Sequence, residues 1–228
     1  MTAVTRAGLL ALIILAPTPP AAVAAETVSG FATVVDGDTI DIGVETVRLF
    51  GIDAAEAGQR CYLSSGADWD CGASATGRLR TLVNGRQISC AVRDIDRYGR
   101  LVSICSAAGG ARDLSAALVS EGLAWAFRRY SDAYVDEEDA ARTARRGVWQ
   151  APTQPPWDFR AERWHAAAAT TPRPGCPIKG NVSWTGERIY HTPWSPWYDR
   201  TGVSTARGER WFCDEAEARA AGWRAARF

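Results

Sequence analysis

The chain has 228 residues, 46% of them hydrophobic and 23% charged, which excludes disordered and collagen-like proteins and suits one medium domain plus a smaller one. Lysine plus arginine and aspartate plus glutamate number 26 each. The resulting net charge of zero argues against a protein that coats DNA by bulk charge alone. His165 and His191 are the only histidines, which argues against zinc hydrolase sites built on several histidines.

The first 25 residues have the pattern of an export signal. Arg6 is followed by the apolar run Ala7–Ala16, and the small residues Ala21–Ala25 contain an A-x-A cleavage site. An apolar run this short does not span a bilayer in the usual way, so an uncleaved N-terminal anchor is the less favoured alternative. No later stretch is apolar enough to cross a membrane. We expect a signal peptide over 1–25, a mature chain that starts near Ala25 or Glu26, and a periplasmic or secreted protein.

The six cysteines fit export and three disulfides, although six cysteines allow 15 pairings and the sequence alone does not choose among them. Cys90 and Cys105 are equally far from the turn-like segment Asp96–Gly99, so a hairpin closed there places them opposite each other, near disulfide distance. The remaining spacing favours two further pairs, Cys61 with Cys71 across a polar loop, and Cys176 with Cys213. A zinc site is less favoured because no C-x-x-C motif occurs.

Proline, tryptophan and charge mark an internal boundary. After the export signal the first proline is Pro152, five prolines crowd into 152–174, and seven of the ten tryptophans follow Gln150. Residues 26–150 hold 14 basic and 18 acidic residues, a net charge of −4, whereas residues 151–228 hold 11 and 8, a net charge of +3. The expected organisation is a main domain over 26–150, a Pro-rich linker over 151–175 and a small Trp-rich module over 176–228.

The main domain has a pattern of strands followed by helices. Short β-branched runs and a hairpin predict five strands: Val28–Val35, Thr39–Val44, Thr46–Ile52, Gln87–Val92 and Leu101–Cys105. Apolar spacing predicts three helices: Ala73–Val83, Leu114–Leu123 and Asp136–Arg146. A helix between the third and fourth strands is typical of a five-stranded OB-type barrel. We therefore predict a mainly β fold with helices (α+β), followed by a small disulfide-stapled module.

Residues able to do chemistry gather in three segments: Val34–Thr39, Arg48–Glu56 and Asp96–Arg100. Asp38 and Asp53 are hard oxygen donors, suited to Ca²⁺ or Mg²⁺ rather than to soft metals. Arg48 and Arg100 are forked donors for phosphate oxygens, and Glu56 remains to act as a base on water. Taken singly, each segment has a plain alternative as a turn, a rim ion pair, a solvated carboxylate or an ordinary hairpin loop.

Taken together, the segments resemble the staphylococcal nuclease (thermonuclease) family over about residues 28–150. That family's D-G-D-T, R-L-x-x-(I/V)-D-x-x-E and D-x-Y-G-R elements occur here in order, and Gly147-Val148-Trp149 matches its later ending. The resemblance implies Ca²⁺ held by Asp38, Asp53 and the backbone carbonyl of Ala54, with Asp36 nearby in an outer shell. It also implies a catalytic trio of Arg48, Glu56 and Arg100, with Tyr98 and Tyr130 beside the nucleotide.

One departure from the family pattern affects the catalytic loop. The usual Thr-Pro before the glutamate is Ala54-Ala55 here. A main-chain oxygen ligand tolerates Ala54, but alanine at position 55 could loosen Glu56, because proline restricts both itself and its predecessor. The Cys61–Cys71 loop is placed where it could stiffen the segment again.

The resemblance implies an exported, Ca²⁺-dependent nuclease that cleaves DNA and RNA to 3′-phosphate and 5′-hydroxyl ends. Because the barrel carries a net charge of −4, Ca²⁺ and local arginines must attract the substrate. The alternatives are a catalytically silent nucleic-acid-binding OB protein of the cell envelope and a structural envelope protein. We expect a monomer.

The C-terminal module is similar to short modules appended to exported nucleases of this family, and distantly to the Ada-type metal-binding domain. It lacks that domain's cysteine set, so zinc is not expected, and a disulfide is the staple that a module of this size needs. We expect His191 to be structural and most of the tryptophans to form the module's core. Residues 151–228 are expected to contribute to substrate affinity or envelope placement rather than to bond cleavage.

Overall fold

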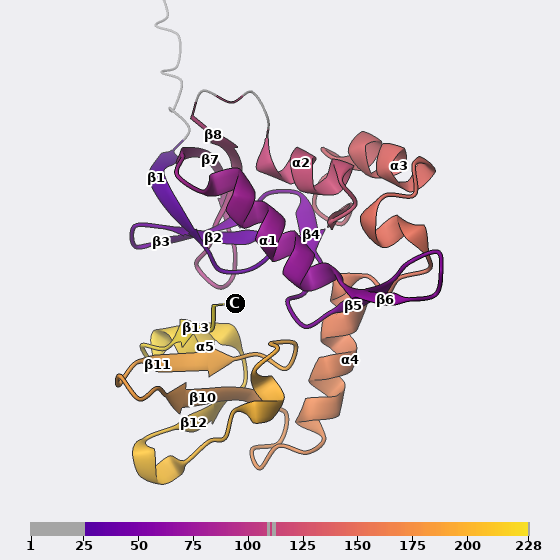
Figure 1. The fold of residues 1–228 in the computed structure, drawn as a ribbon. Helices are drawn as coiled ribbons and strands as arrows, with labels where there is room; N and C mark the ends of the chain where they lie inside the picture. Colours follow the sequence, from indigo (N-terminus) through magenta and orange to yellow (C-terminus); the bar gives the residue numbers. More distant parts are fainter. Residues whose placement is uncertain (1–25, 109, 111–112, 228) are drawn as a thin grey trace, which may run out of the picture.

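The computed structural model describes residues 26–108, 110 and 113–227, so the expected signal peptide over 1–25 lies outside the described residues. Figure 1 shows a larger lobe of barrel and helices, a smaller C-terminal lobe built on a sheet, and the helix α4 (Pro156–Ala168), which starts at the edge of the larger lobe near β5 (Arg60–Tyr62) and β6 (Asp68–Asp70) and runs beside the smaller lobe. Within the described ranges, no helix is long and apolar enough to cross a membrane.

The larger lobe is built on a closed five-stranded barrel in the order β1-β2-β3-β8-β7. Its strands are β1 (Thr27–Val34), β2 (Thr39–Ile42), β3 (Glu45–Leu49), β7 (Gln87–Ile95) and β8 (Leu101–Ala107). Every neighbouring pair is antiparallel except β3 and β8, which run parallel. The alternation of strand residues sends Ile40, Val47 and Ile88 into the core, where each is fully buried. The predicted OB-type barrel is confirmed.

Three helices form near their expected positions: α1 (Cys71–Val83), α2 (Leu114–Ser120) and α3 (Val135–Thr143). The first two pack on the barrel, and α3 packs on α2 and β9 (Ala124–Ala126). Carboxylate caps fix the starts of the first two, because Asp70 accepts from the Ala73 N–H and Asp113 accepts from the Ser115 N–H. The helices expected over Leu114–Leu123 and Asp136–Arg146 end earlier in the structure, at Ser120 and Thr143. The 3₁₀ turn η1 (Gly147–Gln150) follows α3.

The third predicted strand, Thr46–Ile52, is wrong as a single element. The backbone of Gly51 has a φ of 72°, a left-handed conformation that glycine adopts readily and that interrupts the strand. The chain resumes as β4 (Ile52–Ala54), which leaves the barrel and pairs with β9 (Ala124–Ala126). This break carries Asp53 out of the barrel sheet and into the site described below.

All six cysteines are paired, as Cys61–Cys71, Cys90–Cys105 and Cys176–Cys213. These are the pairs that the spacing favours. Cys90 and Cys105 are direct partners across β7 and β8, and Cys61 lies in the small hairpin of β5 (Arg60–Tyr62) and β6 (Asp68–Asp70). The described residues thus hold no free thiol.

The range 151–175, expected to be a linker, contains the helix α4 (Pro156–Ala168). Pro156 lies in its first turn, where a missing N–H costs nothing and the fixed φ suits a helix, so here the proline starts a helix rather than breaking one. The Trp157 ring stacks on Phe127 of the larger lobe at 5.6 Å, and the Trp164 ring lies 6.4 Å from Trp194 of the smaller lobe. The helix therefore packs against both lobes.

The C-terminal lobe is a four-stranded sheet with strand order β12-β10-β11-β13. Its strands are β10 (Ile178–Val182), β11 (Arg188–His191), β12 (Arg210–Phe212) and β13 (Arg224–Ala225), accompanied by α5 (Glu215–Ala220) and the 3₁₀ turns η2 (Tyr198–Arg200) and η3 (Thr205–Arg207). Phe212 and Trp223 meet edge to face at 5.4 Å in its core, whereas Trp184 is almost fully exposed. The expectation that the tryptophans form the core therefore holds for some of them only.

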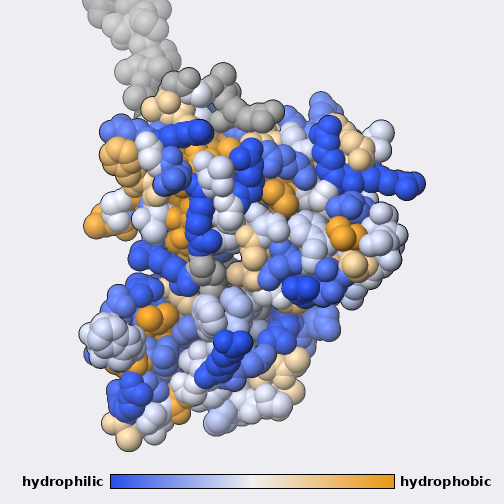
Figure 2. Space-filling view, in the orientation of Figure 1, coloured by the Kyte–Doolittle hydropathy of each residue, from blue (hydrophilic) through white to orange (hydrophobic). Residues whose placement is uncertain are grey.

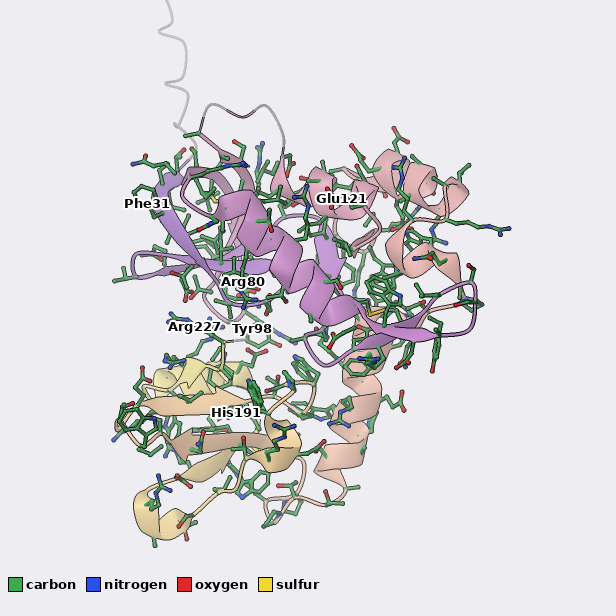
Figure 3. All side chains as sticks on the ribbon, viewed as in Figure 1. Phe31, Arg80, Tyr98, Glu121, His191 and Arg227 are labelled. Atoms are coloured by element: carbon green, nitrogen blue, oxygen red, sulfur yellow. A yellow bond between two sulfur atoms is a disulfide. The ribbon has the colours of Figure 1, made fainter. Side chains whose placement is uncertain are left out.

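His191 lies inside the smaller lobe (Figure 3). Its Nε2 is 3.1 Å from the Asn181 Oδ1 atom, and its Nδ1 is 3.5 Å from the Ser195 Oγ atom. Burial, together with Lys179 and Arg224, lowers the pKa of His191 to about 4. A buried, neutral and hydrogen-bonded imidazole fits the structural role expected for this residue.

Candidate active site

The D-G-D turn between β1 and β2 forms one wall of the site. The Asp36 Oδ1 atom accepts from the Asp38 N–H at 3.1 Å, which closes a local Asx turn. A Cβ atom on Gly37 would lie 2.8 Å from the Ala54 Cβ atom, closer than real contacts allow. Glycine at this position therefore lets the acidic turn approach the end of β4.

The two aspartates of the turn are in different electrostatic environments. Burial opposes the charge on Asp38, but Arg48 and the Ala54 N–H hold its pKa below the ordinary value, with the Arg48 Nη1 atom 3.1 Å from Asp38 Oδ1 and the Ala54 nitrogen 3.0 Å from Oδ2. Burial and the neighbouring Asp38 instead raise the pKa of Asp36 to about 7. Asp38 is thus the permanent anion of the pair, and Asp36 is partly protonated near neutral pH.

Asp53 lies on β4 between two guanidinium groups. Its side chain is fully buried. Arg48 donates from Nη2 to Oδ1 at 3.0 Å, and Arg160 of α4 donates to both oxygens, from Nη1 to Oδ1 at 2.9 Å and from Nη2 to Oδ2 at 2.7 Å. A fully buried carboxylate is stable as an anion only with such partners. One of the two comes from outside the predicted nuclease domain.

Glu56 follows β4 by two residues, and its side chain is 13% exposed. Its Oε1 atom accepts from Arg160 Nη1 at 2.5 Å, and its backbone N–H donates to Gln59 Oε1 at 3.1 Å. The Gln59 amide in turn donates to the Gln154 carbonyl at 2.7 Å. Burial raises the pKa of Glu56 to about 8 against the attraction of Arg160. The carboxyl group is therefore held in place and has a raised proton affinity.

The hairpin tip between β7 and β8 supplies Arg100. Asp96 Oδ1 accepts from the backbone N–H groups of Tyr98 and Arg100, and its Oδ2 accepts from Arg100 Nε at 2.7 Å. Burial opposes the charge on Asp96, but Arg100 and the backbone donors hold its pKa below the ordinary value. Gly99, with a φ of 77°, completes the turn. Residues of this one turn therefore hold Arg100.

The two predicted nucleotide-binding tyrosines lie at the rim. The Tyr98 ring lies 5.3 Å from the Arg100 guanidinium carbon, and its hydroxyl accepts from Arg97 Nη2 at 2.5 Å. Tyr130 is 72% exposed and packs on Phe127 at 5.0 Å. The structure thus brings Tyr98 next to the catalytic candidates, and Tyr130 is an exposed ring that interacts electrostatically with Arg97, the partner of the Tyr98 hydroxyl.

The C-terminal lobe contacts the larger lobe beside these groups. The Tyr98 carbonyl accepts from Arg219 Nη1 at 3.4 Å, and Arg227 pairs with Asp41 at 2.6 Å; Tyr98 and Arg227 both lie at this boundary in Figure 3. Figure 2 shows hydrophilic residues on both lobes where they meet. A cleft of about 210 Å³ lies between the lobes and is lined by residues that include Asp36, Arg100, Arg219, Arg224 and Arg227.

Most of the predicted candidates gather closely. Contacts or attractions link Asp36, Asp38, Arg48, Asp53, Ala54, Glu56 and Arg100. Three residues of the site were missed by sequence reasoning: Gln59, Gln154 and Arg160. The signal for Arg160 is its spacing from Trp157 and Trp164, which places all three on one face of a helix.

The donor chemistry of the site fits a hard divalent cation. The buried aspartates Asp38 and Asp53 pair with the guanidinium groups of Arg48 and Arg160. These carboxylates therefore already draw positive charge to the place where a cation would bind. No group of three or more His, Cys, Asp or Glu side chains suited to a metal occurs in the described part of the chain. A bound ion would therefore depend on two carboxylates, a main-chain oxygen and water, which Ca²⁺ accepts in its irregular shell.

Comparison with known proteins divides the chain into two matches. A family model described as staphylococcal nuclease homologue matches residues 46–151, and one described as ArfC matches residues 159–225. The succinoglycan biosynthesis protein ExoI of Rhizobium meliloti (strain 1021) is 35% identical over 66% of this chain and 74% of its own length. A micrococcal nuclease of Shigella flexneri is 37% identical over 56% of this chain and 76% of its own length. An uncharacterized endonuclease of Escherichia coli is 31% identical over 56% of this chain and 80% of its own length.

Proposed function

The chain belongs to the staphylococcal nuclease family, and on that premise we propose that it hydrolyses phosphodiester bonds of DNA and RNA in the presence of Ca²⁺. The products would be 3′-phosphate and 5′-hydroxyl ends. The observation that carries the proposal is the convergence of Arg48, Asp53 and Glu56 in one half-buried site, with Arg100 facing Asp36 and Asp38 across it. A simple binding surface does not need a held carboxylate with a raised proton affinity.

Glu56 is the general base in this proposal. It takes a proton from a water molecule as the water oxygen forms a bond to phosphorus in line with the departing 5′-oxygen. The phosphorus–oxygen bond to that 5′-oxygen breaks, and the leaving oxygen gains a proton from solvent. A positioned base contributes about 10²- to 10⁴-fold. Burial raises the pKa of Glu56 to about 8, so the carboxylate form that can accept a proton increases as the pH rises through that value.

Arg48 and Arg100 bind the non-bridging oxygens in this proposal. Arg100 uses Nε on Asp96, so its two Nη groups are suited to a forked contact with phosphate. Arg48 donates to Asp38 and Asp53 in the present structure and would exchange part of this contact for phosphate. Because negative charge on the equatorial oxygens grows toward the transition state, such contacts raise turnover and not merely affinity.

Asp38, Asp53 and the main-chain oxygen of Ala54 would hold the cation, with Asp36 beside them. When bound, Ca²⁺ would supply charge neutralisation at a phosphate oxygen. The residues themselves then have a second task, because Asp38 also fixes the end of β4 through the Ala54 N–H. Loss of Asp38 would therefore disturb both the cation site and the loop that leads to Glu56.

The C-terminal lobe adds substrate affinity in this proposal. Its Arg219, Arg224 and Arg227 line the cleft that also contains Asp36 and Arg100, so a strand bound at the catalytic groups would pass beside them. Residues 151–228 carry a net charge of +3 against −4 for residues 26–150, and phosphate contacts of this kind depend strongly on salt.

We further propose that the protein is exported, with 1–25 as a cleaved signal peptide and the mature chain in the periplasm or outside the cell. The support is that all six cysteines pair in the structure, since disulfides persist in oxidising compartments and are rare in the cytosol.

A digestion assay tests the proposed function. The mature protein is incubated with end-labelled single- and double-stranded DNA and with RNA, in Ca²⁺, in Mg²⁺ and in chelator, and the product ends are identified by their response to a phosphatase and a kinase. We expect cleavage in Ca²⁺, none in chelator, and 3′-phosphate ends. Binding of the same oligonucleotides without any cleavage in Ca²⁺ would contradict the proposal and favour a silent binding protein.

A further inference from the structure

Arg160 reaches the catalytic carboxylates from a helix that follows the nuclease family match. That match ends at residue 151, whereas Arg160 lies in the second match, over 159–225. Trp157 and Trp164 anchor the same face of α4 to the larger and the smaller lobe. A side chain midway between two such anchors is held in place by packing on both sides.

The Arg160 contacts are close and directed at two residues. Nη1 lies 2.9 Å from Asp53 Oδ1 and 2.5 Å from Glu56 Oε1, while Nη2 lies 2.7 Å from Asp53 Oδ2. The side chains are 24%, 0% and 13% exposed for Arg160, Asp53 and Glu56. Charge-assisted hydrogen bonds at this depth are stronger and more directional than those of a solvated ion pair.

A second link joins the same segment to the backbone of the catalytic loop. The Gln154 carbonyl accepts from Gln59 Nε2 at 2.7 Å, and Gln59 Oε1 accepts from the Glu56 N–H at 3.1 Å. The segment from Gln154 to Arg160 therefore holds both the main chain and the carboxylate of Glu56. Position 55 is alanine, so no proline ring supplies this restraint from within the loop.

We propose that Arg160 is a positioning residue for Glu56, and that the segment from Gln154 to Arg160 replaces from outside the nuclease domain a restraint that the catalytic loop lacks. The expected effect on kcat rests on the proposed nuclease function. The expected effect on the order of the loop that carries Glu56 rests on the contacts alone. A matched control exists on the same helix, because Arg163 contacts the Pro193 carbonyl and Asp199 instead.

The kinetic test compares Arg160→Gln, Arg160→Lys and Arg163→Gln at saturating Ca²⁺. For Arg160→Gln we expect kcat to fall about 10- to 100-fold, the range for loss of a hydrogen bond to a charged group, with KM for single-stranded DNA within about threefold of wild type. Arg160→Lys should recover part of kcat because it keeps the charge, and Arg163→Gln should behave as wild type. Wild-type or higher kcat for Arg160→Gln would overturn the proposal and mark Arg160 as a competitor of the cation.

Two readouts do not depend on turnover. Calorimetric titration with Ca²⁺ should show that Arg160→Gln binds the ion at least as tightly as wild type, because a positive charge has been removed beside Asp53. A lower kcat in this variant would then not result from weaker binding of Ca²⁺. Hydrogen exchange of the Glu56 amide in the metal-free protein should be about 10-fold faster or more in Arg160→Gln and unchanged in Arg163→Gln. Unchanged exchange in Arg160→Gln overturns the proposal.

The same experiment separates the two proposals. If the wild-type protein cleaves nothing in Ca²⁺, the proposed function fails, while faster exchange at Glu56 in Arg160→Gln still supports the positioning contact. If Arg160→Gln does not fold, Arg160→Lys carries the test, and its Glu56 amide should exchange faster than that of wild type. Wild-type exchange and wild-type kcat in Arg160→Lys and in Gln59→Ala would then overturn the proposal.

Discussion

Arg100 and Glu56 come from motifs of equal clarity, yet the chain holds them in different ways. Arg100 is held by Asp96, four residues earlier in the same turn. Glu56 is held by Gln59 in its own loop and by Arg160, which is 104 residues away. The comparison shows that a short motif can encode both a candidate site residue and its support, or the candidate residue alone.

The largest effect is expected from removing the base itself. Glu56→Gln should lower kcat by at least about 10²-fold, because the amide cannot take a proton from water. The circular dichroism spectrum should remain that of wild type, since the amide keeps the size of the side chain. Near-wild-type digestion of DNA by this variant would contradict the assignment of Glu56.

Removal of the C-terminal region deletes the contacts that hold Glu56 from outside its own loop and leaves the contact between Asp96 and Arg100 intact. A protein that ends at Pro152 lacks both the Gln154 carbonyl and Arg160. We expect kcat to fall about 10- to 100-fold, with a raised KM and a shallower salt dependence because the cleft arginines are also lost. The sequence instead predicts that residues 151–228 contribute to substrate affinity or envelope placement rather than to bond cleavage, and the truncation distinguishes the two predictions.

The truncation is informative only for a protein that still folds, as judged by its near-ultraviolet circular dichroism. Full turnover at saturating substrate would show that the distant contacts are dispensable and would restore the view of the C-terminal region as an affinity module.

The local support is tested by Asp96→Asn. The asparagine keeps the turn geometry but loses the charge that holds Arg100, so we expect kcat to fall about 10-fold, near the lower end for a hydrogen bond to a charged group. Asp94→Asn, also on the β7–β8 hairpin, is the control. Equal activity of the two variants would show that Arg100 does not depend on Asp96.

The smallest effect on turnover is expected for the barrel disulfide. Replacing Cys90 and Cys105 together by alanine opens a crosslink over 15 residues, which should lower the free energy of unfolding by about 3 kcal/mol and Tm by about 6–12 °C. Activity at 25 °C should stay within about twofold of wild type, because the pair lies in the barrel wall. An unchanged Tm would contradict the stabilising role.

The barrel was predictable because its signals are local. Alternating β-branched residues, the turns between strands and carboxylate helix caps all act over a few residues. The split of the third strand at Gly51 was missed because an isolated glycine after Phe50 does not reveal its positive φ. Helix α4 does not follow from the sequence pattern, because a cluster of prolines is typical of a linker, whereas Pro156 lies in the first turn, where proline favours a helix.

The residues of the site also differ in whether local sequence signals predict them. Motif spacing predicted Asp38, Arg48 and Arg100, whose supporting contacts come from residues at most 16 positions away in the chain. It did not predict Arg160, because helix spacing shows which face packs inward and not which carboxylate that face meets. The contact depends on how two separately patterned regions are docked, and that is a property of the folded chain.

A double-mutant cycle between Glu56 and Arg160 tests most directly the claim that the C-terminal region acts through the catalytic base. Single-turnover cleavage rates in saturating Ca²⁺ are measured for wild type, Glu56→Gln, Arg160→Gln and the double variant. If Arg160 acts by positioning Glu56, the double variant should cleave no more than about twofold more slowly than Glu56→Gln alone. Fully additive losses, with the double variant a further 10-fold or more below Glu56→Gln, would contradict the account.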